Sequence, residues 1–196
     1  MTVTDSPRQL GRPRDPRLDE AITAATLELL ADGGYAALTM EAVAARAGVG
    51  KATLYRRWAG KEALVIDAVS SMSEQPEPDA GTSVRDELVG LLDAVRRKSA
   101  SSLAGKIFPR LIGESADNPE LMRRYREQVL DPRRERFHAA LRRGVTEGCV
   151  RPDVDLDHAT DLMVGPMAYR NLIRNDPPPG PDLAARIVDD VLISLA

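Results

Sequence analysis

Cysteine and aromatic residues are scarce in this sequence. Cys149 is the only cysteine, so a disulfide within the chain is excluded. We expect its side chain to be a small buried apolar group, with a thiol sensor as the alternative. Aromatic residues make up 4% of the 196 positions, and no run of alternating β-branched residues is long enough to indicate a sheet. A core of Leu, Val, Ala, Ile and Met, in a sequence rich in strong helix formers, predicts an all-α fold.

Long apolar runs are also missing. No stretch of about 18 apolar residues, the length that a membrane-spanning helix needs, occurs in the sequence. The first residues lack the basic and apolar regions of a secretory signal. We therefore expect a cytoplasmic protein with no membrane partner.

Patterns of residues for catalysis or metal binding are absent as well. The sequence has no G-x-S-x-G pattern, and His138 and His158 have no Cys or carboxylate partner at a zinc-ligand spacing. The acidic run at residues 153–157 begins like a calcium-binding loop, but the positions that require Gly and Glu hold His158 and Val164. We therefore expect no enzymatic activity, no metal and no cofactor, and we interpret the acids as a helix cap and solvated charges.

Two short helical patterns surround a glycine turn. Four apolar residues recur with the spacing of an amphipathic helix, namely Met40, Val43, Ala44 and Ala47. Thr39 precedes them and can cap the helix, and Gly48 can end it in a left-handed conformation. A second helix is expected over about residues 50–58, with Leu54 and Trp58 facing inward. Two such helices across a tight turn indicate a helix-turn-helix.

Basic residues cluster in the same stretch. Residues 46–61 hold five Lys or Arg and no Asp or Glu, in a chain of net charge −3. Residues 63–196 carry 18 basic and 22 acidic side chains, so only the N-terminal end suits a polyanion. Four residues of the second helix share a face suited to base edges and phosphates in a major groove, namely Lys51, Ala52, Tyr55 and Arg56. A solvated basic hairpin is the alternative interpretation.

This stretch resembles the TetR-type (tetracycline-repressor-like) family of transcriptional regulators. The resemblance covers roughly residues 17–66 and rests on the run G-V-G-K-A-T-L-Y-R-R-W followed by K-E-A-L. The positions that match are Thr39, the Ala-Gly-Val turn at 47–49, Leu54, Tyr55, Trp58 and Lys61. Two positions depart from the family pattern: Glu41 stands where many members have Arg, and Gly50 replaces a frequent Ser or Thr cap. We carry no base contact over to position 41.

The resemblance implies the organisation of the whole chain. An N-terminal three-helix helix-turn-helix domain binds DNA, and a C-terminal helical domain binds a ligand and dimerises, with about nine helices in all. We expect a flexible basic arm at 1–16, the DNA-binding domain with its connecting helix at 17–72, and the second domain at 83–196. The boundary falls in S-E-Q-P-E-P-D-A-G-T at 73–82, where prolines, acids and a glycine break the helical pattern.

We assign DNA contacts to ten residues. The phosphate contacts are predicted for Thr39, Tyr55 and Lys61, and the base contacts for Lys51, Thr53 and Arg56. Ala52 permits close approach and Arg57 adds positive charge. In the arm, the run G-R-P-R resembles the core of an AT-hook, so Arg12 and Arg14 are predicted to enter a narrow A·T minor groove. A solvated tail is the alternative for the arm.

The first helix is expected to begin at Pro16 or Arg17 and to end at 32–35, and the fourth is expected over about 60–72. Five helical segments are expected beyond the boundary, over about 83–99, 103–115, 119–148, 155–172 and 183–195. Pro132 should kink or split the third of these, because it removes a backbone donor within the helix. By resemblance, the first three enclose a ligand pocket and the last two form the homodimer interface.

Seven residues are predicted to line a mostly apolar cavity with two phenol groups, namely Phe108, Leu111, Met122, Tyr125, Met163, Met167 and Tyr169. Ordinary core packing is the alternative for each. The function that follows is a ligand-responsive repressor, which binds double-stranded DNA at a palindromic operator as a homodimer and is released by a small, mostly apolar effector. The rival interpretations are a DNA-binding module without a ligand cavity, and a helical enzyme or carrier with a merely structural hairpin.

Overall fold

The computed structural model describes residues 16–72, 79–101, 103–114, 116–174, 177 and 179–195. Every regular element in these ranges is helical: α1 (Pro16–Ala37), α2 (Met40–Ala47), α3 (Lys51–Tyr55), α4 (Lys61–Ser71), α5 (Val84–Ala100), α6 (Ala104–Gly113), α7 (Pro119–Tyr125), α8 (Asp131–Glu147), α9 (Leu156–Tyr169) and α10 (Leu183–Leu195). Two π-helical turns, η1 (Arg126–Leu130) and η2 (Arg170–Arg174), continue α7 and α9. The predicted all-α fold is confirmed. The basic arm and its Arg12 and Arg14 lie outside the described residues.

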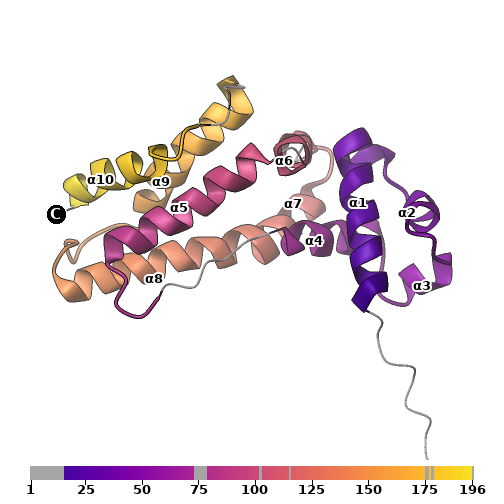
Figure 1. Ribbon diagram of the computed structural model, residues 1–196, viewed down its shortest axis with the longest axis horizontal. Helices are drawn as coiled ribbons and strands as arrows, with labels where there is room; N and C mark the ends of the chain where they lie inside the picture. Colours follow the sequence, from indigo (N-terminus) through magenta and orange to yellow (C-terminus); the bar gives the residue numbers. More distant parts are fainter. Residues whose placement is uncertain are drawn as a thin grey trace, which may run out of the picture.

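The molecule is elongated, with a small head at one end. Figure 1 shows α1, α2 and α3 together at that end, while α5, α8, α9 and α10 form the body at the other. Between them, α4 leads from the head toward the body, where α6 and α7 also lie. One core runs across this join, because Leu54 of the head and Leu111 and Tyr125 of the body belong to the same buried cluster. The two predicted domains therefore share apolar packing where they meet.

The helix-turn-helix has the caps that its sequence predicts. The Thr39 side chain accepts a hydrogen bond from the Ala42 backbone N–H, at 3.1 Å. Gly48 ends α2 in the left-handed region at φ 67°, and its N–H donates to the α2 carbonyls of Ala44 and Ala45. These local bonds satisfy backbone groups that a free helix end leaves open.

The sequence predicts that the first helix ends at 32–35, but the structure has a kink there instead of an end. The helix does not end there but resumes as far as Ala37 beyond a kink at Gly34, where φ is 74° and ψ is −177°. One side chain of α6 and one at its C-cap hold this kink. The Arg110 guanidinium donates to the carbonyl of Asp32 at 3.0 Å, and a Glu114 carboxylate oxygen accepts from the N–H of Ala36 at 3.3 Å. The kink is thus a junction between the head and α6.

Replacing Gly34 by alanine is expected to lower the free energy of unfolding by about 1–3 kcal/mol, because this backbone region is essentially confined to glycine. Gly90 is the matched control, since a Cβ there meets no atom within 4 Å and the residue lies within α5. Gly90→Ala should stabilise by about 0.4–1 kcal/mol. Urea unfolding of the two variants measures both values, and equal shifts of one sign would show that the Gly34 backbone is unstrained.

The body packs α5 against α8, α9 and α10 around a second core. Leu88, Leu92, Phe137, Leu141 and Val188 are all at most 1% exposed there. Pro132 was expected to kink or split the long helix; in the structure the helix is not split, and α7 passes through the π-helical turn η1 into α8 just before Pro132. A proline has no N–H for the preceding turn, so a widened turn accommodates the ring. Because α7, η1 and α8 are continuous, the described helices match the nine expected.

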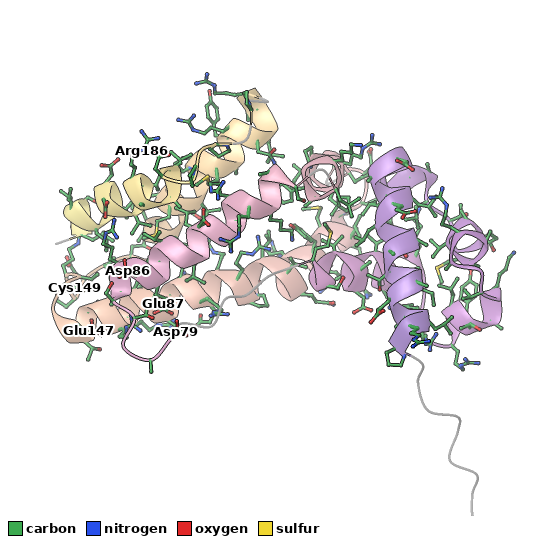
Figure 2. All side chains as sticks on the ribbon, viewed as in Figure 1. Asp79, Asp86, Glu87, Glu147, Cys149 and Arg186 are labelled. Atoms are coloured by element: carbon green, nitrogen blue, oxygen red, sulfur yellow. The ribbon has the colours of Figure 1, made fainter. Side chains whose placement is uncertain are left out.

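The expectation of a buried Cys149 is wrong, because its side chain is exposed. α8 ends at Gly148 in the left-handed region, at φ 77°, and the chain then turns so that Val150 enters the core at 3% exposure. Cys149 therefore lies on the outside of the turn. Figure 2 shows it at the far end of the body, in the same region as Asp86, Glu87 and Glu147 and well away from α2 and α3.

The acidic run after this turn serves local structure. The Asp155 side chain caps α9 by accepting from the N–H of His158 at 3.0 Å, as predicted, and Asp157 pairs with Arg134 of α8 at 2.7 Å. Within the described ranges, no group of His, Cys, Asp and Glu is arranged to hold a metal ion. No helix in the part of the chain that the structure describes is long and apolar enough to cross a membrane.

Candidate nucleic-acid interface

Helix α3 is short, and a buried leucine and a nearby indole are among the contacts that hold it. It spans Lys51–Tyr55 instead of the expected 50–58, because the chain passes into a turn after Tyr55. Among its five residues only Leu54 is buried, at 0% exposure. Just beyond the helix, the Trp58 indole N–H donates to a carboxylate oxygen of Asp67 on α4, at 2.9 Å. One apolar side chain and one indole thus fix the position of the helix on the head.

The opposite side of α3 faces solvent. Lys51, Ala52, Tyr55 and Arg56 are all exposed, and Thr53 is half-buried. Tyr55 is 53% exposed, which is high for a large aromatic side chain. The structure therefore brings these five predicted contact residues together on and beside one short helix. Their contact with DNA stays a prediction.

Glu41, which departs from the family pattern, has a partner in this structure. A carboxylate oxygen of Glu41 on α2 lies 3.0 Å from the Lys51 ammonium on α3, and both side chains are more than half exposed. The hydrogen bond from Lys51 is the main cause that holds the pKa of Glu41 below its ordinary value. If Lys51 contacts DNA as predicted, Glu41 competes with DNA for its ammonium group.

Replacing Glu41 by glutamine is expected to raise affinity for DNA several-fold at low salt, because it releases Lys51 and removes a charge that repels phosphate. The slope of log affinity against log salt should steepen by about 0.9 per chain if Lys51 then contacts a phosphate. Fluorescence anisotropy across a salt series measures this slope. Glu147→Gln, the same change at the far end of the body (Figure 2), is the control, and equal effects of the two variants would contradict a local role for Glu41.

Arg57 is mostly buried, unlike the exposed residues of α3. Its side chain is 13% exposed and pairs with Asp19 at the start of α1, at 3.0 Å. A DNA contact by Arg57 stays a prediction, while in this structure its guanidinium is paired with Asp19. Arg57 instead joins the residues after α3 to the first turn of α1.

Lys61 is also turned inward. Its ammonium donates to the carbonyl of Tyr35 at 2.8 Å and lies 4.0 Å from the centre of the Tyr35 ring, a cation–π contact. Burial lowers the pKa of Lys61. Burial, followed by the nearby carboxylates of Glu62 and Glu114, raises the pKa of Tyr35 to about 12. A phosphate contact by Lys61 stays a prediction, while in this structure its ammonium joins α4 to the end of α1.

The seven residues predicted to line an effector cavity lie in three places. Phe108, Leu111 and Tyr125 border a gap of only about 10 Å³, which residues of α4 and α5 also line, and Met122 packs against the same core. Met163 and Met167 belong to the separate core of the body, and Tyr169 is 55% exposed. These seven therefore do not form one cavity in the single chain. For six of the seven, helical spacing indicated a side that faces the interior but not which of the two cores it enters, and for Tyr169 it indicated the wrong side.

A larger cavity lies where α4, α5, α6 and α8 meet. Its volume is about 150 Å³, and its described lining residues are Met72, Leu91, Ala94, Val95, Arg97, Lys98, Ser101, Ala104, Arg133 and Arg136. The sequence interpretation missed all ten. One of the ten could have been predicted from sequence. Arg133 follows Val129 by four positions, and residues four apart in a helix lie on the same side, so this cation was expected beside a buried side of the helix.

Comparison with known proteins identifies both halves of the chain. Residues 22–68 match the family described as bacterial regulatory proteins, tetR family, and residues 77–191 match the tetracyclin repressor-like C-terminal domain. The HTH-type transcriptional regulator YdeS of Bacillus subtilis is 35% identical over 168 residues, 85% of this chain and 84% of that protein. The DNA-binding transcriptional repressor TetR of Mycobacteroides abscessus is 32% identical over 178 residues, 89% and 92% of the two chains.

Solved structures agree with these matches. The TetR family transcription regulator SCO0332 is 31% identical and superposes with a TM-score of 0.68, over 92% of this chain and 99% of that chain. FadR from Bacillus subtilis shares the fold with a TM-score of 0.71 at 17% identity, over 90% and 99% of the two chains. The chain therefore belongs to the TetR family and is a helix-turn-helix DNA-binding transcriptional regulator, not an enzyme.

Proposed function

We propose that the protein is a ligand-responsive repressor, which binds a palindromic operator as a homodimer and leaves it when a small effector occupies the body. The observation that carries this proposal is the solvent-facing side of α3, where Lys51, Tyr55 and Arg56 are exposed while Leu54 anchors the helix from behind. A repressor of this kind binds the chromosome, which in a bacterial cell lies in the cytoplasm. We therefore propose a cytoplasmic location.

The DNA contacts follow from the chemistry of this side of the head. Lys51, Thr53 and Arg56 are proposed to read base edges in the major groove. Tyr55 and Thr39 are proposed to hold phosphates. The Thr39 oxygen accepts the capping bond of α2, so its hydroxyl proton remains for a phosphate oxygen. Arg12 and Arg14, in the arm before α1, are proposed to lie in the adjacent minor groove.

In the proposed dimer, two chains contact each other through the part of the body that lies away from the head. Apart from Tyr55, the large apolar side chains that the described residues leave exposed are Leu162, Tyr169, Ile173 and Ile193, with exposures from 41% to 78%. They lie on α9, η2 and α10. A contiguous patch of exposed apolar side chains marks a protein interaction surface, and we propose that these four side chains belong to one such patch. A two-fold dimer through them would present two copies of α3 to half-sites about one DNA turn, roughly 34 Å, apart.

The proposed release uses α6 as the link between cavity and head. Its first residue, Ala104, lines the 150 Å³ cavity, and Arg110 and Glu114 bind the backbone on either side of the α1 kink. A ligand that binds better when α6 is displaced would also displace α1 and the helix-turn-helix, and would lower operator affinity by that difference in binding free energy. FadR from Bacillus subtilis, of the same fold, was solved with stearoyl-CoA, which supports a small-molecule effector.

The direct test uses the full chain and the DNA upstream of its own coding region. We expect a mobility shift that survives an excess of unrelated duplex, and a mass in solution near twice 21.3 kDa. A monomer, or equal affinity for the upstream and unrelated duplexes, would contradict the proposal. Single-stranded DNA of the same sequence is the control for charge alone.

A further inference from the structure

A second, smaller space lies beside the 150 Å³ cavity, which is called the outer cavity below. This inner gap is the one of about 10 Å³ that Phe108 and Tyr125 border, and it is close to the size of one water-sized probe. Three residues line both spaces, namely Met72, Lys98 and Ala104. The two spaces are therefore neighbours, and these three side chains lie where they meet.

The inner gap has mostly apolar walls. Ile107, Leu111 and Tyr125 line it and are at most 2% exposed, and the centre of the Phe108 ring lies 6.2 Å from that of Tyr125. We assign no ligand contact to the four Lys and Arg side chains that line the outer cavity, because each already takes part in another interaction. The apolar walls therefore decide which ligand fits.

Met72 can open the join between the two spaces. It forms the C-cap of α4 and is only partly buried against the core, and a methionine side chain is unbranched with several rotatable bonds. Ala104 of α6, in contrast, is small and is 3% exposed. A change in the conformation of the Met72 side chain therefore widens the passage from the outer cavity to the inner gap.

We propose that the effector carries a straight aliphatic chain, and that Met72 sets the chain length that the site accepts. The outer cavity has the volume of an engineered cavity that accepts benzene, so it holds about six carbon atoms. A longer chain has to pass Met72 and Ala104 into the inner gap, beside Ile107 and Phe108 of α6. A straight chain is the narrowest apolar group and displaces these walls least. This inference rests on the proposed function, because α6 and its C-cap also hold the α1 kink.

The experiment uses uncharged alcohols of increasing length. The full chain is titrated by calorimetry into dilute butanol, hexanol, octanol and decanol, and into adamantanol, which folds as many carbons as decanol into a cage. We expect affinity to rise about fourfold for each added methylene and to go on rising beyond hexanol. Adamantanol should bind at least about tenfold more weakly than decanol, because the cage cannot enter the inner gap without overpacking it.

Two variants with opposite expected effects locate the chain. Met72→Ala widens the join and should raise the affinity for decanol relative to hexanol at least about threefold. Ala104→Val narrows the join and should weaken decanol at least about tenfold while butanol keeps its affinity. Met122→Ala is the matched control, because Met122 packs against the same core but is not among the described lining residues of either space.

The proposal is overturned if no alcohol binds, if affinity stops rising beyond hexanol, or if adamantanol binds as tightly as decanol. It is also overturned if Met122→Ala changes the ratio of decanol to hexanol affinity as much as Met72→Ala does. If neither cavity variant folds, the alcohol series and adamantanol on the unaltered chain still decide.

Failure of this inference is distinguishable from failure of the proposed function, because calorimetry contains no DNA. Anisotropy on the operator measures release separately, with each alcohol added in turn. The expected chain-length dependence without release of the operator supports the straight-chain site and contradicts ligand-responsive release. Release by adamantanol, with no binding of the straight alcohols, supports a ligand-responsive repressor and overturns the straight-chain effector.

Discussion

Replacement of Arg56 by alanine is expected to lower affinity for the matched operator by between about 30-fold and about 25,000-fold. The Arg56 side chain is exposed just beyond α3, where a guanidinium can bind a guanine edge through two hydrogen bonds. Such a contact contributes about 1–3 kcal/mol of discrimination, and a homodimer makes it twice. The loss should be far smaller on an operator that is mismatched at the contacted base pair, because the contact is already absent there.

Mobility-shift titrations on matched and mismatched duplexes measure this difference. Arg46→Ala is the control within the head, since Arg46 is exposed but pairs with Glu28 on α1 at 2.9 Å. It should change binding to both duplexes by the same small factor. Equal losses on the two duplexes for Arg56→Ala would remove its base-reading role and leave only a phosphate contact.

Replacement of Leu54 by alanine is expected to lower the free energy of unfolding by about 2–5 kcal/mol and to abolish measurable operator binding. Leu54 is 0% exposed, and it is the only buried residue of the five in α3. A helix of one to two turns is not stable by itself in water, so α3 depends on this anchor. Its loss should free the recognition helix even where the rest of the fold survives.

Urea unfolding followed by circular dichroism, together with anisotropy on the operator, measures both effects. Leu54→Met is the matched control, because a swap that conserves volume costs less than about 1.5 kcal/mol. It should keep most of the operator affinity. If Leu54→Ala binds the operator as wild type does, α3 is held by contacts other than this side chain.

The features that sequence predicted correctly depend on neighbours a few residues apart. The caps at Thr39, Gly48 and Asp155 each join groups three to four residues apart, so local spacing is sufficient. The sequence also placed an irregularity at Pro132, because a proline lacks the backbone N–H, although it predicted a kink or a split where the structure has a widened turn in a continuous helix. The all-α fold follows from the same helical spacings, added along the chain.

The features that sequence missed depend on how distant helices meet. Arg57 and Lys61 looked like surface cations, but their partners, Asp19 and Tyr35, lie more than 25 residues earlier in the chain. Lys98 and Arg133 were passed over as cavity residues because charged side chains are mostly found on the surface. A cavity lined from α4, α5, α6 and α8 exists only once those helices are packed.

The most direct test of the account is a selection of binding sites by the full chain from a pool of random duplexes. We expect an enriched palindrome, with the centres of its half-sites about one helical turn apart and two chains bound to each duplex. Arg56→Ala should lose preference at one symmetric pair of positions. Recovery of no enriched sequence, or of a single half-site bound by one chain, would contradict a dimeric repressor that reads its operator with α3.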